Sequence, residues 1–195
     1  GDFRSGYYRD QTLMFALGVA NVEDYFSQLY ADTLHDPYSG GKNMNAHFAT
    51  PFVNEKGEWN NLVNQYNISA DIAPTAGQMM RGLGMAFASN CFRNAKHKEA
   101  FTHLSNNGNE VCFCTIGDAS TSEGHFWEVV NAAGVIQAPL AILVYDDGYG
   151  ISVPTHLQTT KASISEALAG FEKKEGTNGI KILKVKGWDY AALCE

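Results

Sequence analysis

Two short, unbroken runs of apolar residues lie near the middle of the chain, and acidic residues follow each of them at once. The first run covers Val111 to Ile116 and stops at Gly117-Asp118. The second covers Leu140 to Tyr145 and stops at Asp146-Asp147-Gly148. Runs of this length without polar alternation are typical of strands covered on both faces, as in a parallel sheet. We therefore expect two parallel strands whose carboxyl ends both carry aspartates.

A helix is expected between these two strands. Thr121 and Ser122 are suited to cap its N-terminus, and Glu123 falls in its first turn. Its apolar residues recur at helical spacing, at Phe126, Trp127, Val130 and Ala133. Because the ends of parallel strands lie at one edge of an open sheet, where ligands bind, Asp118 and Asp147 should face a common ligand.

The N-terminal third contains two helical patterns and then a long irregular stretch. The first pattern runs from Thr12 to Leu17, and the second is capped by Asn21 with Asp24 three residues on. The apolar residues of the second helix should lie against the sheet: Val22, Tyr25, Phe26, Leu29 and Tyr30. From His35 to Asn67 no period is visible, and so long an irregular stretch is usually functional, disordered or buried against a partner.

A longer helix is expected from Pro74 to about Asn90. Its interior is rich in small residues, which implies close packing: Gly77, Gly82, Gly84, Ala86 and Ala88. The pattern then predicts a short helix over Ser165–Phe171 and a strand over Ile180–Val185. This alternation favours a layered α/β fold with a parallel sheet and helices on both faces, which we predict as a single domain over residues 1–195.

Composition narrows the class of protein. The chain has 195 residues, of which 45% are hydrophobic, and a formal net charge of -7. It carries no Lys/Arg-rich stripe, which argues against a nucleic-acid partner. No apolar run approaches the roughly 20 residues needed to span a bilayer, so we expect no membrane partner and a cytoplasmic or other soluble intracellular location. Both ends look cut, which suggests a piece of a longer protein.

Two carboxylates at adjacent strand ends offer oxygen ligands, which suit a hard cation. Magnesium is usually held by one or two carboxylates while phosphates complete its shell. The backbone N–H groups of Ala119 and Ser120, ahead of the helix, could bind phosphate oxygens. The pattern therefore indicates a phosphate-bearing ligand bridged by magnesium, with turn-shaping aspartates as the alternative.

Several segments together resemble a known family. Gly117-Asp118-Ala119-Ser120 followed by Asp146 to Ser152 resembles the thiamine diphosphate motif, a Gly-Asp-Gly and a later Asn-Asn pair. Four further segments keep the order of one group within that family: Tyr8-Arg9, Lys42 to His47, Ser122-Glu123-Gly124 and Tyr149 to Thr155. Over nearly its whole length the chain is similar to the alpha part of the dehydrogenase component of 2-oxo acid dehydrogenase complexes, of the branched-chain (2-oxoisovalerate) type.

The resemblance implies thiamine diphosphate and Mg²⁺ as cofactors. The metal would be held by the side chains of Asp118 and Asp147 and the backbone carbonyl of Tyr149. The diphosphate contacts would come from Tyr8, Arg9, Ala119 and Ser120.

Three further residues match the family's site. Ala70 and Ile72 match the segment that supports the bent cofactor, with plain core packing as the alternative. His47 matches a catalytic histidine near the substrate, although a lone histidine in a loop is more often structural.

Three positions depart from the family pattern. Ala119 replaces the second glycine of the motif, which a small side chain allows if φ stays negative. Asp147 replaces an asparagine and adds a negative charge beside an anionic diphosphate. Tyr145 lies where branched-chain relatives place an arginine, so one phosphate contact is missing or comes from elsewhere.

The resemblance implies oxidative decarboxylation of a 2-oxo acid with acyl transfer to a lipoyl-bearing acyltransferase. A beta part, separate or fused, would complete the active site, and this chain alone would turn over negligibly. A pyruvate or acetoin dehydrogenase alpha part is the alternative within the fold. A non-enzymatic, magnesium-binding, receiver-like module is the alternative of another class, with Lys184 or Lys186 as the lysine that it would need.

Overall fold

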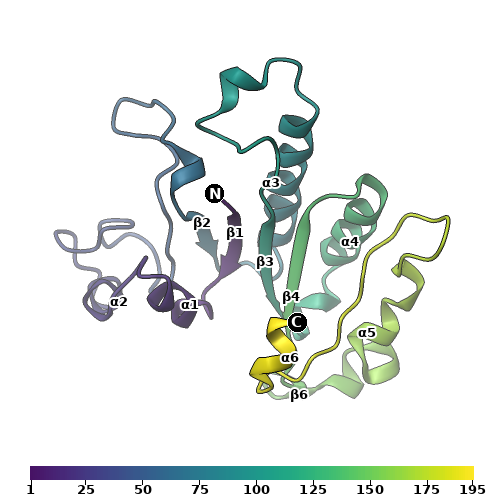
Figure 1. The fold of residues 1–195 in the computed structure, drawn as a ribbon. Coiled ribbons are helices and arrows are strands. Elements are labelled where there is room, and N and C mark those ends of the chain that lie inside the picture. The colour runs from purple at the N-terminus through teal and green to yellow at the C-terminus, as the bar shows by residue number, and fades with distance from the viewer.

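Four parallel strands form the centre of the chain, in the order β2-β1-β3-β4 (Figure 1). The computed structural model describes residues 1–195. The strands are β1 (Phe3–Tyr7), β2 (Asn67–Ile72), β3 (Cys112–Gly117) and β4 (Leu140–Tyr145). Residues of β3 and β4 pair in register from Cys112 with Leu140 to Gly117 with Tyr145. The predicted parallel α/β sheet is confirmed. Asp118 directly follows β3 and Asp146 directly follows β4, so these two residues lie at the ends of neighbouring strands.

Strands β1 and β2 were not predicted, because polar residues interrupt them. In the fold these side chains are buried and paired with distant backbone groups. Ser5 Oγ donates to the carbonyl of Gln78 at 2.9 Å, and Ser69 Oγ donates to the carbonyl of Arg4 at 3.0 Å. Asn67 Nδ2 donates to the carbonyl of Gly1 at 2.9 Å. Buried polar groups are tolerated when they are paired in this way, and an apolar pattern cannot reveal them.

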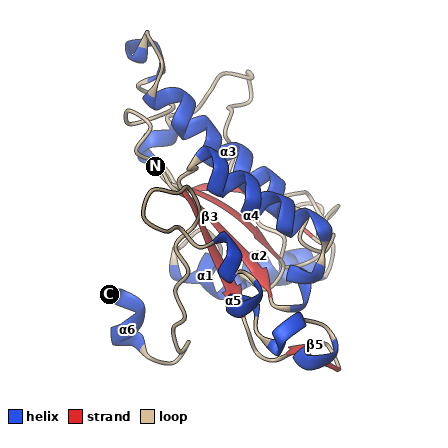
Figure 2. Cartoon of the chain, turned by 90° about the vertical axis from the view of Figure 1, so that its right-hand side faces the viewer, coloured by secondary structure: helices blue, strands red, loops and turns tan.

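Helices α3 (Gln78–Arg93) and α4 (Gly124–Ile136) lie along one face of the sheet (Figure 2). An ideal Cβ on Gly82 would lie 3.1 Å from the sulfur of Cys114, so the small residue does permit close packing there. An ideal Cβ on Gly84 would meet no atom within 4 Å, so this glycine is not needed for close packing. The helix begins at Gln78 rather than at Pro74, since the carbonyl of Pro74 accepts from Gly77 in a preceding turn.

The second face is covered unequally. Helix α1 (Gln11–Ala16) packs there through Met14, which shares a buried cluster with Phe48 and Ile68. Over β3 and β4 the same face is open, and its side chains are 41 to 43% exposed: Phe113, Leu143 and Tyr145. Helices therefore lie on both faces, as predicted, but a strip of apolar sheet is left uncovered.

Helix α2 (Val22–Leu29) begins where the sequence predicted, but the prediction of its buried face is wrong. Asn21 Oδ1 accepts from the N–H of Asp24 at 2.9 Å, and Asp24 Oδ2 accepts from the N–H of Asn21 at 3.0 Å. The side chains expected against the sheet are mostly exposed instead: Val22, Phe26, Leu29 and Tyr30. Gln28 points inward because its amide bonds both backbone groups of His47.

The C-terminal part consists of short elements. These are strands β5 (Tyr149–Gly150) and β6 (Val153–Pro154) and helices α5 (Ile164–Ala167) and α6 (Tyr190–Cys194). Single 3₁₀ turns cover Leu62–Asn64, Lys98–Phe101, Ala119–Ser122, Thr155–Leu157, Thr160–Ala162 and Ala169–Phe171. The helix expected over Ser165–Phe171 is therefore confirmed as α5 and the last of these turns.

The prediction of a strand over Ile180–Val185 is wrong, because this segment forms no strand. Only one bridge forms, between Glu172 and Ile180. Ile180 and Ile182 instead use their side chains to pack against the buried cluster between α3, α4 and α5. Helix α6 stands clear of the sheet in Figure 2. No helix in the structure is long and apolar enough to cross a lipid bilayer.

Candidate functional site

The turn after β3 is built around Asp118, which is 7% exposed. Its N–H donates to the carbonyl of Tyr145 at 3.1 Å, which ties the turn to the end of β4. Its carboxylate accepts from the N–H of Ala119 at 2.7 Å. Thr121 Oγ1 donates back to the carbonyl of Asp118 at 2.6 Å. Bonds to the end of β4 and to its own turn thus hold Asp118 at the carboxyl edge of the sheet.

One expectation about this turn needs correction. Thr121 and Ser122 do not cap helix α4, whose N-cap residue is Glu123 and carries no side-chain cap. They belong instead to the 3₁₀ turn that Asp118 caps. The N–H of Ala119 donates to the Asp118 carboxylate, and its contact with a phosphate oxygen stays a prediction. Ala119 has a negative φ, which meets the condition for replacing glycine.

The turn after β4 packs directly on Ala119. An ideal Cβ on Gly150 would lie 2.7 Å from the Cβ of Ala119, so only glycine fits this close approach. Gln158 Nε2 also donates to the carbonyl of Ala119 at 2.8 Å. Asp147 Oδ1 accepts from the N–H of Tyr149 at 3.0 Å, which shapes the turn. The two acidic strand ends therefore converge, as the sequence predicted.

Charge at this edge is negative and unbalanced. Burial raises the pKa of Asp118 above its ordinary value, and the carboxylates of Asp147 and Asp146 raise it further. A cation between these carboxylates would relieve the repulsion. No group of three or more His, Cys, Asp or Glu side chains is arranged to hold a metal alone. A metal here would need the Tyr149 carbonyl and oxygens of a ligand, which fits magnesium with a diphosphate.

Tyr8 and Arg9 lie in the turn between β1 and α1. The guanidinium carbon of Arg9 lies 5.1 Å from the centre of the Tyr8 ring, a cation–π contact. Both side chains are exposed, and Arg9 forms no ion pair within the chain. Arg9 is therefore a cation available to an anionic ligand.

A small cleft joins this turn to the one after β3. It is lined by Tyr7, Tyr8, Ala73, Pro74, Thr75, Ala76, Gln78 and Ser120. The structure thus brings together Tyr8 and Ser120, two of the predicted diphosphate contacts. Ala70 and Ile72 do not line the cleft. Residues of the turn that follows β2 line it instead, and the role of Ala70 and Ile72 beside a cofactor stays a prediction.

A buried ion network lies beneath the Tyr8-Arg9 turn. Arg4 pairs with both Asp10 and Asp71, and both carboxylates have no exposed surface. Asp10 also accepts from Thr115 Oγ1 and, at 3.4 Å, from the N–H of Tyr7. Arg4 Nη1 lies 2.8 Å from Asp71 Oδ1 but is not aligned for a hydrogen bond. The network joins β1, β2 and β3 at the carboxyl edge.

His47 lies outside the cleft, in the long irregular stretch before β2. It is 7% exposed, and its Nδ1 is 2.9 Å from the carbonyl oxygen of Asn45. Its backbone is held by the side chain of Gln28. These contacts account for a structural role, and a catalytic role stays a prediction.

Comparison with known proteins decides the family. The Dehydrogenase E1 component family matches residues 1–195. The chain belongs to this family. Within it, the 2-oxoisovalerate dehydrogenase subunit alpha of Bacillus subtilis is 27% identical over 87% of this chain and 43% of its own length. The mitochondrial 2-oxoisovalerate dehydrogenase subunit alpha of Mus musculus is 24% identical over 98% of this chain and 35% of its own.

A shorter match links this Dehydrogenase E1 component chain to the pyruvate dehydrogenase E1 component subunit alpha of Acholeplasma laidlawii. It is 38% identical over 44% of this chain and 23% of the relative. The chain thus spans less than half the length of these relatives.

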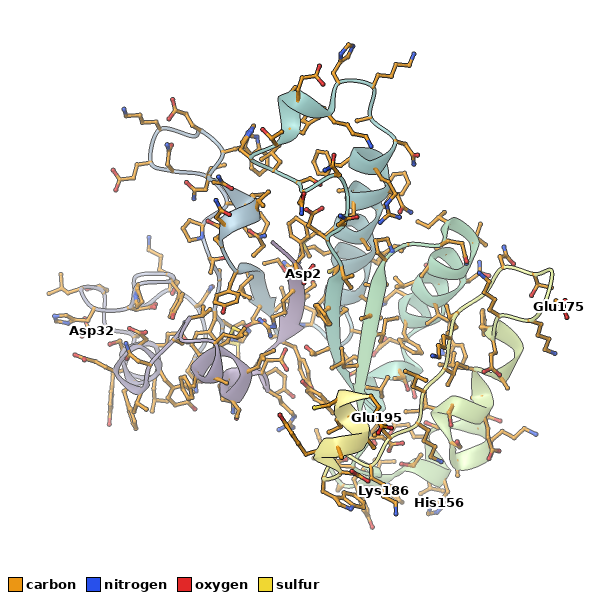
Figure 3. The ribbon with its side chains drawn as sticks, viewed as in Figure 1. Asp2, Asp32, His156, Glu175, Lys186 and Glu195 are labelled. Carbon is orange, nitrogen blue, oxygen red and sulfur yellow. The ribbon has the colours of Figure 1, made fainter.

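The family assignment excludes the receiver-like alternative. Lys184 and Lys186 also belong to the segment that forms no strand ladder, so neither follows a strand end. Figure 3 labels Lys186 near helix α6.

Proposed function

We propose that this chain is the cofactor-binding part of the alpha subunit of a 2-oxo acid dehydrogenase. The enzyme would oxidatively decarboxylate a branched-chain 2-oxo acid and pass the acyl group to a lipoyl group on an acyltransferase. One observation carries the proposal. The Asp118 turn, the Asp147 turn and the Tyr8-Ser120 cleft converge at one edge of a parallel sheet, where ligands of such sheets bind.

In this proposal magnesium is held by Asp118, Asp147 and the Tyr149 carbonyl. Thiamine diphosphate, when bound, would supply a nucleophilic carbon and the electron sink for decarboxylation. The chain's own residues bind and orient the diphosphate end. Arg9 supplies positive charge on one side, and Ser120 supplies a hydroxyl on the other.

The arginine carries an unusual share of this binding. Asp147 replaces the asparagine that relatives of this type would carry, so the site holds one more negative charge. Tyr145 cannot supply the positive charge of the arginine expected there, and it stays neutral because burial and the Asp10 carboxylate raise its pKa to about 12. Arg9, whose planar fork suits phosphate oxygens, is then the cation of the Tyr8-Arg9 turn and is engaged in no ion pair.

The open strip of sheet supports a protein partner. Both faces of a parallel sheet are normally covered, and the side chains of Phe113, Leu143 and Tyr145 are not. We propose that a beta subunit completes the active site and that the chain does not turn over without it.

The substrate proposal rests on how far the relatives extend along this chain. The two 2-oxoisovalerate dehydrogenase subunits align with 87% and 98% of it, whereas the pyruvate dehydrogenase subunit aligns with 44%. This favours a branched-chain 2-oxo acid over pyruvate or acetoin.

A substrate comparison tests the proposed function. The full-length alpha subunit, assembled with its beta subunit and both cofactors, should decarboxylate 2-oxoisovalerate with a kcat/KM about ten times or more that for pyruvate. A difference of this size is what a pocket shaped for a branched alkyl group provides. Equal or higher kcat/KM for pyruvate or acetoin would replace the substrate assignment. If the complex decarboxylates neither 2-oxoisovalerate nor pyruvate nor acetoin, the proposal that it is a 2-oxo acid dehydrogenase is overturned.

A further inference from the structure

Two residues that line the cleft each carry a buried polar atom with no partner within the chain. The atoms are the hydroxyl of Tyr7 and the side-chain oxygen of Gln78, on residues that are 7% and 1% exposed. Both residues line the cleft together with Ser120. Because buried polar atoms in folded proteins are nearly always paired, two unpaired atoms on residues of one cleft point to a missing ligand.

Neither atom can be satisfied by a simple side-chain movement. Gln78 Nε2 donates to the carbonyl of Thr115 at 2.8 Å, which fixes the amide and leaves its oxygen without a partner. The ring of Tyr7 is packed between aromatic neighbours, with ring centres 5.3 Å from Tyr8 and 6.4 Å from Tyr145. The fold therefore holds both groups in place ahead of any ligand.

The Tyr7 hydroxyl lies beside the motif that precedes Asp118. An ideal Cβ on Gly117 would lie 3.5 Å from Tyr7 Oη and 3.9 Å from Ser120 Oγ. The two hydroxyls thus flank one point at the end of β3. Gly117 leaves that point open because it carries no side chain.

The chemistry of the two hydroxyls suits an anionic oxygen. Burial, and next the Asp10 carboxylate, raises the pKa of Tyr7 far above its ordinary value, so its hydroxyl stays protonated and can donate. Ser120 can also donate, whereas the Gln78 oxygen can only accept. A ligand that fills the cleft must therefore offer an acceptor to Tyr7 and a donor, such as a bound water molecule, to Gln78.

We propose that the Tyr7 hydroxyl, together with Ser120, donates a hydrogen bond to a phosphate oxygen of the diphosphate, and that Gln78 holds a water molecule beside it. This inference rests on the proposed function. It explains how the diphosphate is bound although Tyr145 stands where an arginine is expected. The contact comes from a neutral donor on β1 instead, which packs against Tyr145.

The test uses the full-length alpha subunit assembled with its beta subunit. Tyr7→Phe removes the hydroxyl and keeps the ring, and binding of thiamine diphosphate with Mg²⁺ is measured by titration calorimetry. The dissociation constant should rise about ten- to hundredfold, the loss expected for a hydrogen bond to a charged group. Binding of thiamine without phosphates should not change. Tyr66→Phe, at an exposed tyrosine, is the matched control and should bind like wild type.

A second variant keeps the proposal testable if Tyr7→Phe fails to assemble. Gly117→Ala places a methyl group at ordinary contact distance between the two hydroxyls and should weaken diphosphate binding likewise. Wild-type affinity in whichever variant assembles overturns the role of Tyr7 while the proposed function stands. Failure of the wild-type complex to bind thiamine diphosphate overturns the proposed function itself.

Discussion

Asp118→Ala is expected to abolish magnesium-dependent binding of thiamine diphosphate by the full-length subunit in its complex. Asp118 is the buried carboxylate of the pair at the sheet edge, and burial together with Asp147 and Asp146 raises its pKa. A metal that neutralises this cluster depends on the carboxylate directly. Loss of a direct ligand should therefore weaken cofactor binding by more than about 100-fold, the upper range for groups that only support a ligand.

The matched variant is Asp147→Asn. Asparagine keeps an oxygen at the same place and removes the extra charge beside the diphosphate, so binding should persist. Titration calorimetry measures both variants, and circular dichroism checks that each variant keeps the fold of the wild type. Wild-type affinity in Asp118→Ala, or lost affinity in a folded Asp147→Asn, would mean that these aspartates only shape turns.

Arg4→Met is expected to lower the free energy of unfolding by about 3 to 5 kcal/mol. The substitution leaves Asp10 and Asp71 without their cation, and neither side chain has any exposed surface. Arg9→Met is the matched control, because Arg9 is exposed and forms no ion pair within the chain. It should change stability by no more than about 0.5 kcal/mol. Urea unfolding of the full-length chain gives both values, and similar midpoints for the two variants would contradict the account.

Folding stability should depend on pH through Asp71, one of the carboxylates of this network. Burial raises the pKa of Asp71 to about 6 from 3.8, although Arg4 acts in the opposite direction. Because the folded pKa is the higher one, the folded state binds this proton more tightly. The stability that Asp71 contributes is then full below about pH 4 and is lost as the pH rises to about 6. Asp71→Asn should remove that decline relative to the wild type.

The parts of the fold that the sequence predicted are those whose pattern depends on neighbours along the chain. Strands β3 and β4 are apolar runs, and the capping box of α2 lies within four residues. Strands β1 and β2 were not predicted, because the polar side chains of Ser5, Asn67 and Ser69 bond backbone groups far away in the sequence. The same limit explains the strand wrongly expected over Ile180–Val185, where the apolar pattern was present and no pairing strand was.

The candidate site divides in the same way. Asp118 and Asp147 were predictable, because parallel strands bring their carboxyl ends to one edge. Tyr7 and Gln78 were not, since their role appears only when the ends of β1 and β3 and the start of α3 form one cleft. The turn after β2 was missed for the same reason.

Calorimetric titration of the wild-type complex with thiamine diphosphate tests the central claim most directly. The alpha subunit, assembled with its beta subunit, should bind one thiamine diphosphate per alpha chain when Mg²⁺ is present and lose that binding when the metal is chelated. Absence of binding, or binding of equal strength without magnesium, would contradict the assignment of the sheet edge as a magnesium and diphosphate site.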